Sequence, residues 1–379
     1  MIKRIYLDYN ATTPVDQRVL DKMYPYFVSE FGNASSQHPF GWTAQKAVEL
    51  ARLQVSSLIG APTCKDIIFT SGASESNTLA ILGFAKKLQK QRLKTHFITS
   101  KAEHLSVLNA MTAAEDLGVE VTYLPVNKFG QVEIETITNA LKPHTALLSF
   151  MWANNEVGSL NPISQIAKLA ENKKLIFHTD ATQACGKLQI NLHDLKIDLL
   201  SISAHKIYGP KGIGALYINK TFNESLGLLP IIFGGNQEWG LRSGTLNIPG
   251  IVGFGLACEI AQSEQNDCSR LNNYVQKIWT ELKDFYPSLE WNGHPTERIV
   301  GHMNFLFRDK RIDQLLPRMV KLSMSSGSAC ASSDSSVSHV LEAMGLSREE
   351  ILASVRLSVG RMTSFEEVEE TCRILKEYL

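Results

Sequence analysis

The chain has 379 residues, of which 44% are hydrophobic, and this is enough for two domains that each bury a core. Lysine plus arginine and aspartate plus glutamate each number 38, so no net charge favours nucleic acid or an acidic membrane surface as a partner. The N-terminus lacks the apolar core of a signal peptide, and the longest apolar stretch, Leu226 to Phe233, is interrupted by Pro230, so we expect a cytoplasmic protein.

Short apolar runs that end in small or polar residues predict the strands of a sheet. They cover residues 66–70, 95–100, 120–126, 146–152, 175–179, 198–203 and 214–218. Helical spacing lies between several of them. One helical face, in the segment that begins at Gly41, consists of Ala44, Ala47, Val48, Ala51, Val55 and Leu58. This alternation predicts an α/β fold with a largely parallel sheet between layers of helices.

The pattern changes near Gly250, where residues 251–262 predict a long helix and the polar stretch 263–269 follows. Strand patterns are fewer beyond this point. We therefore expect a second, smaller α+β domain after about residue 260.

Candidate site residues follow the predicted strands, because ligands of open α/β sheets bind beyond the carboxyl ends of the strands. The turn 70–78 opens a helix and offers backbone N–H groups that suit a phosphate, although an ordinary helix start with a glycine explains it as well. Asp180 follows one strand, with Gln183 three residues on, and Lys206 lies in a glycine-rich turn after another. Taken singly, Asp180 could cap a helix and Lys206 could be a surface charge.

The six cysteines are scattered along the chain without paired spacing, which argues against a disulfide framework or a zinc site. Most of them are expected to be small buried hydrophobic residues. Cys330 differs, because it stands in the polar, small-residue run SSGSACASSDSS. We predict an exposed thiol there, on a flexible segment.

One chemistry needs this combination of residues. Pyridoxal phosphate (PLP) requires a lysine that holds its aldehyde as a Schiff base, a carboxylate that keeps its pyridine nitrogen protonated, and a phosphate site at a helix start. Lys206, Asp180 and the turn 70–78 supply these groups in a suitable order. No metal is expected, because the Cys-x-x-Cys and His-Glu-x-x-His patterns do not occur, and the nucleoside-triphosphate loop is missing too.

The chain resembles the cysteine desulfurases of the NifS/IscS type, which are fold type I PLP enzymes related to class V aminotransferases. The resemblance runs nearly end to end. It rests on the segments LDYNATTP (7–14), FGN (31–33), TSGASES (70–76), NNEVG (154–158), HTDATQ (178–183), SAHKIYGPKG (203–212), RSGT (242–245), SSGSAC (325–330) and SVRLS (354–358).

The resemblance implies the α/β fold of a type I PLP-dependent transferase, with a mainly parallel seven-stranded sheet flanked by helices and a smaller α+β domain. We assign residues 16–260 to the large PLP-binding domain, and residues 1–15 and 261–379 to the small domain. The small domain would carry the mobile loop of the catalytic Cys330, at about 323–338.

The resemblance also implies a role for each candidate residue at the coenzyme. Lys206 would form the Schiff base and later move the Cα proton, and Asp180 would pair with the pyridinium nitrogen. Gln183 would hydrogen-bond the ring hydroxyl oxygen. His104 would stack on the ring and shuttle protons; the alternative is a helix-start histidine that faces solvent. The phosphate would be bound by Ala73, Ser74, Ser203 and His205.

Two further groups follow from the resemblance. Asn155, beside the coenzyme, and Arg356 would hold the substrate carboxylate, because a guanidinium meets two oxygens at once. A structural ion pair is the alternative for Arg356. Thr245 would reach the phosphate of a second subunit, so we expect a homodimer.

The implied activity is the removal of sulfur from L-cysteine, giving L-alanine and a persulfide on Cys330, whose thiolate attacks the substrate sulfur. The persulfide would pass to an acceptor protein, for iron–sulfur cluster assembly or tRNA thiolation, without direct contact with nucleic acid or membrane. The alternatives are a selenocysteine lyase, a transaminase that does not need Cys330, and a non-catalytic scaffold with the PLP fold.

The sequence departs from the family pattern at three positions. Ser74 stands where threonine is common, and it keeps the hydroxyl. Asn236 replaces a glycine and Trp239 replaces an arginine. Asparagine tolerates left-handed backbone geometry, so we expect the turn to persist. The lost arginine is expected to alter the dimer or the mouth of the site.

Overall fold

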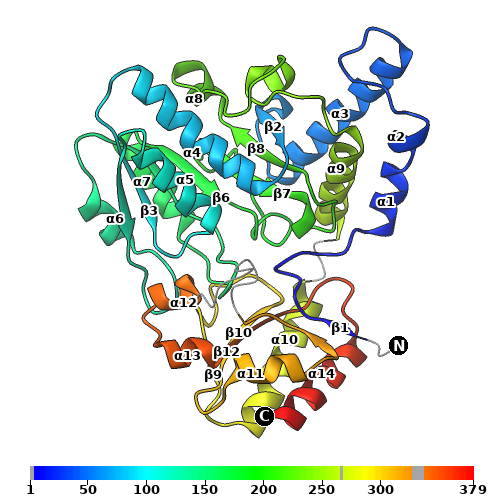
Figure 1. Ribbon diagram of the computed structural model, residues 1–379, viewed down its shortest axis with the longest axis vertical. Helices are drawn as coiled ribbons and strands as arrows, with labels where there is room; N and C mark the ends of the chain where they lie inside the picture. Colours follow the sequence, from blue (N-terminus) through cyan, green and yellow to red (C-terminus); the bar gives the residue numbers. More distant parts are fainter. Residues whose placement is uncertain (1–3, 265–267, 327–336) are drawn as a thin grey trace.

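The computed structural model describes residues 4–264, 268–326 and 337–379. Figure 1 shows two bodies, one above the other, with both chain termini at the lower, smaller one. The sheet of the larger body contains β2 (Ile67–Thr70), β3 (His96–Ser100), β4 (Glu120–Leu124), β5 (Thr145–Ser149), β6 (Ile176–Asp180), β7 (Leu199–Ser203) and β8 (Gly214–Ile218), in the order β2-β8-β7-β6-β5-β3-β4. Only β8 runs antiparallel to its neighbours. The prediction of a mainly parallel seven-stranded sheet is confirmed.

Each predicted run contains a strand, but the ends differ. The largest difference follows β5, which ends at Ser149, whereas the apolar run continues to residue 152. The backbone N–H of Met151 donates to the side chain of Glu103 at 2.9 Å. The N–H groups of Phe150 and Trp152 still donate to the backbone oxygens of His178 and Asp180 on β6, so hydrogen bonds to β6 continue past Ser149 and the residues stay buried.

Helices cover both faces of this sheet. One face packs on α3 (Pro39–Leu58), α6 (Ile134–Ala140), α7 (Ile163–Lys173) and α9 (Ile248–Ser263), and the other on α4 (Ala73–Lys90), α5 (Leu105–Glu115) and α8 (Lys220–Ser225). The helices predicted from Gly41 and from residue 251 are α3 and α9. These two touch closely at Gly255, where a Cβ would lie 2.6 Å from the Cα of Ala51. Any larger residue at position 255 would push them apart.

The smaller body is an α+β arrangement. Strands β10 (His302–Leu306) and β12 (Ser354–Ser358) pair antiparallel, with β9 (Glu290–Trp291) at the edge, and β1 (Ile5–Tyr6) pairs with β11 (Leu322–Ser323). Its helices are α10 (Cys268–Phe285), α11 (Ile312–Leu315), α12 (His339–Ala343), α13 (Arg348–Leu352) and α14 (Phe365–Tyr378).

The chain's first strand belongs to the smaller body by its packing. Ile5 and Leu7 share a hydrophobic cluster with buried residues from Val275 to Leu375. The proposed domain division requires this packing, because it assigns residues 1–15 to the small domain with residues 261–379. The division into this domain and residues 16–260 stays a prediction. Helix α12 packs across to the larger body, where Val340 and Leu341 share a cluster with Ala102 and Val157.

Two further expectations concern cysteines and membranes. Cys185, Cys258 and Cys372 are buried free thiols, as the sequence predicted for most cysteines, whereas Cys330 lies outside the described residues. No helix in the described ranges is long and apolar enough to cross a bilayer.

The turn after residue 233 differs from the expected geometry. Asn236 has an ordinary φ of −92°, so its tolerance of left-handed geometry is not used. The left-handed residues are instead Glu238 (φ 45°) and Trp239 (φ 54°), where β-carbons cost about 1 kcal/mol or more each.

A buried ion pair holds this turn. Arg52 on α3 donates two hydrogen bonds to the carboxylate of Glu238, at 2.8 and 2.7 Å, and both side chains are almost fully buried. The guanidinium lies between the rings of Phe69 and Trp239, 4.7 Å from each centroid. Trp239 therefore covers the ion pair, and these contacts offset the strained backbone.

We predict that Arg52→Met destabilises the protein by about 3–5 kcal/mol, because it leaves the Glu238 carboxylate buried without a cation. Urea unfolding measures the loss. The double variant Arg52→Met/Glu238→Leu removes both charges and should recover much of the stability. Arg373→Met, which breaks an exposed ion pair with Glu370, is the control and should leave the midpoint unchanged. A double variant as unstable as Arg52→Met would refute the charge explanation.

Candidate active site

A cavity of about 690 Å³ lies at the carboxyl ends of the sheet strands and is lined by residues of both bodies. Its volume suits a small cofactor with a bound substrate. Ten of the predicted site residues line it: Ala73, Ser74, His104, Asn155, Asp180, Gln183, Ser203, His205, Lys206 and Arg356. Thr245 is exposed and does not line this cavity. Cys330 lies outside the described residues, so its role stays a prediction.

The start of α4 is an anion site. Gly72 precedes the helix with a φ of 155° and offers no side-chain cap, so the first N–H groups, those of Ala73 and Ser74, remain available. A Cβ on Gly72 would meet only the Oγ of Ser203, at 3.9 Å, so open space precedes the helix. This space, with the positive end of an 18-residue helix behind it, fits a phosphate group.

Asp180 ends β6 with its side chain buried, at 6% exposure. Its oxygens accept from Nδ2 of Asn77 at 2.8 Å and from the N–H of Thr182 at 3.0 Å. Both donors are neutral, and no lysine or arginine in the described ranges forms an ion pair with this carboxylate. A buried carboxylate without a cation is costly, so this position fits a ligand that brings a positive charge.

His104 precedes α5 and is partly buried, which argues against the solvent-facing alternative. Its Nδ1 accepts from the N–H of Ser106 at 3.2 Å and lies 2.8 Å from the Ser106 hydroxyl. That hydroxyl accepts from Nδ2 of Asn77 at 2.9 Å, so its own proton points to His104. The neutral ring therefore carries its proton on Nε2. Burial lowers the pKa of His104 and favours this neutral form.

Asn77 and Ser106 were not predicted as site residues. One Asn77 amide group donates to both Asp180 and Ser106, so it joins the carboxylate to the histidine. The sequence carried a signal, because Asn77 lies four residues after Ala73 and so on the same helical face. No spacing rule relates it to Ser106, since that contact depends on how α4 packs on α5.

Lys206 lies in the short helical turn Ala204–Lys206 that follows β7. Its amine donates to the backbone oxygens of Asn10 and Ala11, at 2.6 and 2.7 Å. The segment of residues 8–13, which comes from the smaller body, thus crosses directly beside the predicted Schiff-base lysine. Sequence reasoning used this segment only as part of the resemblance.

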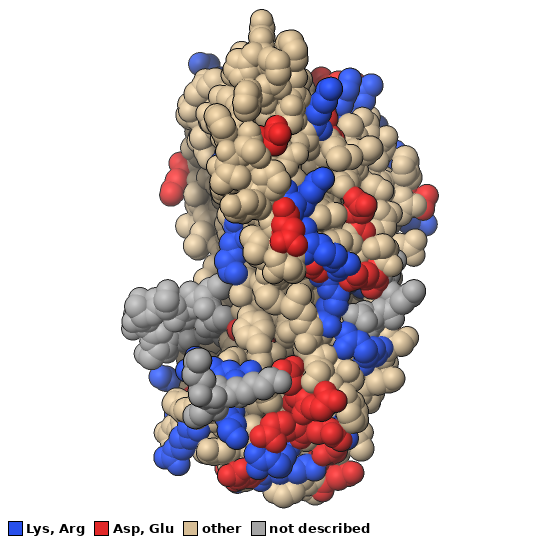
Figure 2. All heavy atoms as spheres, turned by 90° about the vertical axis from the view of Figure 1, so that its right-hand side faces the viewer, with Lys and Arg blue, Asp and Glu red and all other residues tan. Residues whose placement is uncertain are grey.

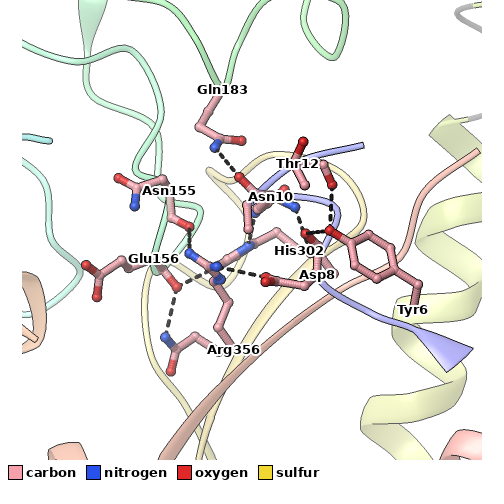
Figure 3. Close-up of polar contacts among 12 residues, drawn as sticks. Tyr6, Asp8, Asn10, Thr12, Asn155, Glu156, Gln183, His302 and Arg356 are labelled. Atoms are coloured by element: carbon pink, nitrogen blue, oxygen red, sulfur yellow. Dashed lines mark hydrogen bonds and ion pairs between the residues drawn. The ribbon is translucent and has the colours of Figure 1, made fainter. Parts of the chain in front are cut away.

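Arg356 on β12 is almost fully buried and reaches the cavity from the smaller body. It donates to the backbone oxygen of Asn155 at 3.0 Å and to the carboxylate of Asp8 at 2.8 Å, as Figure 3 shows. The structural ion pair named as an alternative therefore exists. Its buried Nε has no hydrogen-bond partner in the described part of the chain, so donors remain for a ligand carboxylate.

The segment that follows the undescribed residues 327–336 also borders the cavity. Val337 and His339 line it, and Nε2 of His339 lies 2.9 Å from the backbone oxygen of Glu103. Ser338 donates to the buried carboxyl group of Glu156. These contacts fasten the start of α12 to the larger body, and none of the three residues was predicted as part of the site.

The residues present fit PLP. The uncapped α4 start suits the phosphate, the unpaired Asp180 suits a protonated ring nitrogen, and Lys206 lines the same cavity.

Comparisons with known proteins agree with this chemistry. The sequence profile of the family described as aminotransferase class-V matches residues 5–371. The chain is 43% identical over 373 residues to cysteine desulfurase IscS of Rickettsia massiliae strain Mtu5, covering 98% of this chain and 90% of that protein. It is 42% identical to the human cysteine desulfurase, covering 98% and 80%.

Solved structures give the same picture. A NifS-like protein superposes with a TM-score of 0.90 at 34% identity, covering 99% of this chain and 98% of the other. A structure described as SspA in complex with cysteine has a TM-score of 0.82 at 38% identity, covering 93% and 98%.

The carboxyl group of Glu103, beside His104, yields a pH-dependent prediction. Burial raises its pKa to about 8, although hydrogen bonds from Ser100 and Met151 oppose the shift. The folded protein keeps a proton that the unfolded chain releases above pH 4.5, so wild-type stability falls as the pH rises from 4.5 to about 8. The slope is about 1.4 kcal/mol per pH unit for one group.

Glu103→Gln removes the titration, and its amide oxygen can still accept from the N–H of Met151 while its NH2 group donates to the Ser100 hydroxyl in place of the bond that the carboxyl group accepted. Urea unfolding at pH 5, 6, 7 and 8 should show its stability rising relative to wild type at each step. Glu171→Gln, at an exposed position on α7, is the control, and its unfolding free energy should change with pH as that of the wild type does. Parallel curves for Glu103→Gln would show that Glu103 is ionised in the fold.

Proposed function

The chain belongs to the class-V aminotransferase family and is a PLP-dependent cysteine desulfurase, and from this premise we propose which residues perform the reaction. The observation that carries the assignment is the convergence of ten expected residues on one cavity. We propose that L-cysteine binds there, that its sulfur passes to Cys330 as a persulfide, and that L-alanine leaves.

The chain's own groups hold the coenzyme. The N–H groups at the start of α4, with Ser203 and His205, bind the phosphate, and Lys206 binds the aldehyde carbon. Asp180 keeps the ring nitrogen protonated. Bound PLP supplies an electron sink that makes the Cα proton of an attached amino acid acidic. Burial lowers the pKa of His205 to about 4 and so favours the neutral ring, which can still donate one N–H hydrogen bond to a phosphate oxygen.

Substrate positioning and proton transfer fall to other residues. Arg356, with donors left over from its contacts to Asp8 and Asn155, receives the substrate carboxylate. The amine of Lys206 would also move the Cα proton of the bound substrate. His104 presents an Nε2–H group to the cavity, so in its neutral form it donates a hydrogen bond there, and it would have to gain a second proton before it could act as a general acid.

The sulfur step involves one bond made and one broken. The thiolate of Cys330 forms a bond to the substrate sulfur, and the pair of electrons from the Cβ–S bond stays with the carbon. That carbon then takes up a proton, so the product is alanine. The persulfide is delivered to an acceptor protein, in iron–sulfur cluster assembly or tRNA thiolation. The cytoplasm stays the predicted location.

We also propose a homodimer in which Thr245 completes the partner's phosphate site. Thr245 is exposed and absent from the lining of its own cavity. Nearby elements expose large apolar side chains: Tyr24, Phe27, Phe31, Phe40, Trp42, Phe233 and Trp239. Figure 2 shows that the projecting upper part of the face formed by α1 (Gln17–Met23), α2 (Pro25–Val28) and the start of α3 carries few charged side chains. Such a surface suits a second copy of the chain.

Cys330→Ala tests the sulfur step. It should abolish persulfide formation and lower alanine release from cysteine by at least about 100-fold, because no nucleophile remains for the sulfur. Alanine formation and persulfide labelling report the loss. Cys372→Ala, at a buried cysteine, is the control and should keep both. Alanine release from selenocysteine that survives in Cys330→Ala, with cysteine turnover lost, would favour a selenocysteine lyase instead.

Mixed dimers test the shared site. Lys206→Ala and Thr245→Asp should each be inactive, the second because a carboxylate repels the phosphate. Unfolding and refolding them together should restore about a quarter of wild-type activity, because one site in four then combines Lys206 with the partner's intact residue 245. Each variant refolded alone is the control. No recovery on mixing, with dimers present by sedimentation, would place Thr245 at its own subunit's site.

A further inference from the structure

Lys187 brings an ammonium group to the buried side of the predicted site. The side chain as a whole is half-buried, and its amine donates to Oδ1 of Asn10 at 3.0 Å and to Oε1 of Gln183 at 2.9 Å. Both acceptors are buried residues of the cavity lining, whereas Lys187 itself does not line the cavity. It therefore lies one layer behind the site, and no step of the reaction uses it.

The Lys187 amine and acceptor-only backbone oxygens together set the orientation of both amides. A protonated amine only donates, so each amide must turn its oxygen toward Lys187 and its nitrogen away. Nε2 of Gln183 accordingly donates to the backbone oxygen of Asn10 at 2.9 Å and keeps a second N–H group, on a residue that lines the cavity. Figure 3 shows Gln183 above Asn10, with its amide group pointing toward Asn10.

The same donor-to-acceptor direction of hydrogen bonding continues through Asn10 into the smaller body. Nδ2 of Asn10 donates to Nδ1 of His302, so the neutral imidazole carries its proton on Nε2 and donates to the backbone oxygen of Glu156 at 3.0 Å. Burial lowers the pKa of His302, which keeps the ring neutral. Lys187, Asn10 and His302 thus form a chain with one consistent direction, in which the Lys187 amine is the donor at one end and the backbone oxygen of Glu156 is the acceptor at the other.

Asn10 also connects this chain to Lys206. Its backbone oxygen accepts from both Gln183 and Lys206. A change in the Asn10 amide therefore moves the segment against which the catalytic lysine rests.

We propose that Lys187 is a positioning residue, which fixes Gln183 as a hydrogen-bond donor toward the ring oxygen of the coenzyme and holds Asn10 in place beside Lys206. The inference rests on the proposed function, because it deepens the role given there to the coenzyme site. Burial, together with repulsion from Lys206 and Arg356, lowers the pKa of Lys187 to about 7. The two hydrogen bonds that Lys187 donates need only two N–H bonds, so they persist in the neutral amine.

The test is a double-mutant cycle read from the coenzyme's absorption spectrum rather than from activity. A donor at the ring oxygen stabilises its anionic form, so losing the donor should raise the midpoint of the spectral pH titration by about one unit. We expect Lys187→Met and Gln183→Ala each to produce this rise, and the double variant to rise no further than Gln183→Ala alone. PLP affinity should fall by about tenfold in all three.

Controls separate the possible outcomes. Lys168→Met, at an exposed position on α7, should give the same midpoint of the spectral pH titration as the wild type. Additive midpoints would mean that Lys187 acts only through its charge, and a wild-type midpoint in Lys187→Met would remove it from the site; either result overturns the inference. A Gln183→Ala midpoint equal to wild type, or a holoprotein without a coenzyme band, would instead contradict the proposed function.

Should Lys187→Met fail to fold, Lys187→Gln serves in its place. Its shorter neutral amide can accept as well as donate, so it no longer dictates which way Gln183 points. A partial rise of the midpoint supports the positioning role, and a wild-type midpoint contradicts it.

Discussion

The site is organised around a buried carboxylate that forms no ion pair with a lysine or arginine in the described part of the chain. Asp180 ends β6 in the centre of the sheet, and its protein partners are the neutral groups of Asn77 and Thr182. Desolvating a charge in this way costs several kcal/mol unless a positive group joins it. The protein therefore has a strong electrostatic preference for a ligand with a protonated nitrogen at this point. The two other requirements of PLP, an anion site and an amine, lie in the same cavity.

A second constraint is that the two bodies complete one site together. Residues 8–13 begin in the smaller body, yet their backbone and side chains contact Lys206, His205, Gln183 and Arg356. Because Arg356 and Lys206 both hydrogen-bond this short segment, its backbone helps to fix their separation. A movement of the smaller body would therefore shift the guanidinium and the amine together.

The sequence predicted those parts of the fold and site that local patterns encode. The strand end at Asp180, the turn with Lys206 after β7, the helix start at Ala73 and the face of α3 are local features, and the structure has them. Lys187, His302 and Asn77 escaped prediction because their partners are distant along the chain; Lys187 and Asn10, for example, are 177 residues apart. In the sequence, Trp239 is noticeable only because it replaces an arginine of the family pattern. The fold shows that its ring covers the guanidinium of Arg52.

The most direct test of this account asks which lysine binds the coenzyme. Reduction of the PLP-loaded protein with borohydride fixes the coenzyme covalently to the amine that holds it, and peptide mass spectrometry then locates the modified residue. The account predicts modification at Lys206 alone. Modification of Lys187, whose amine is less than 3 Å from Gln183, or of Lys211, which also lines the cavity, would contradict it.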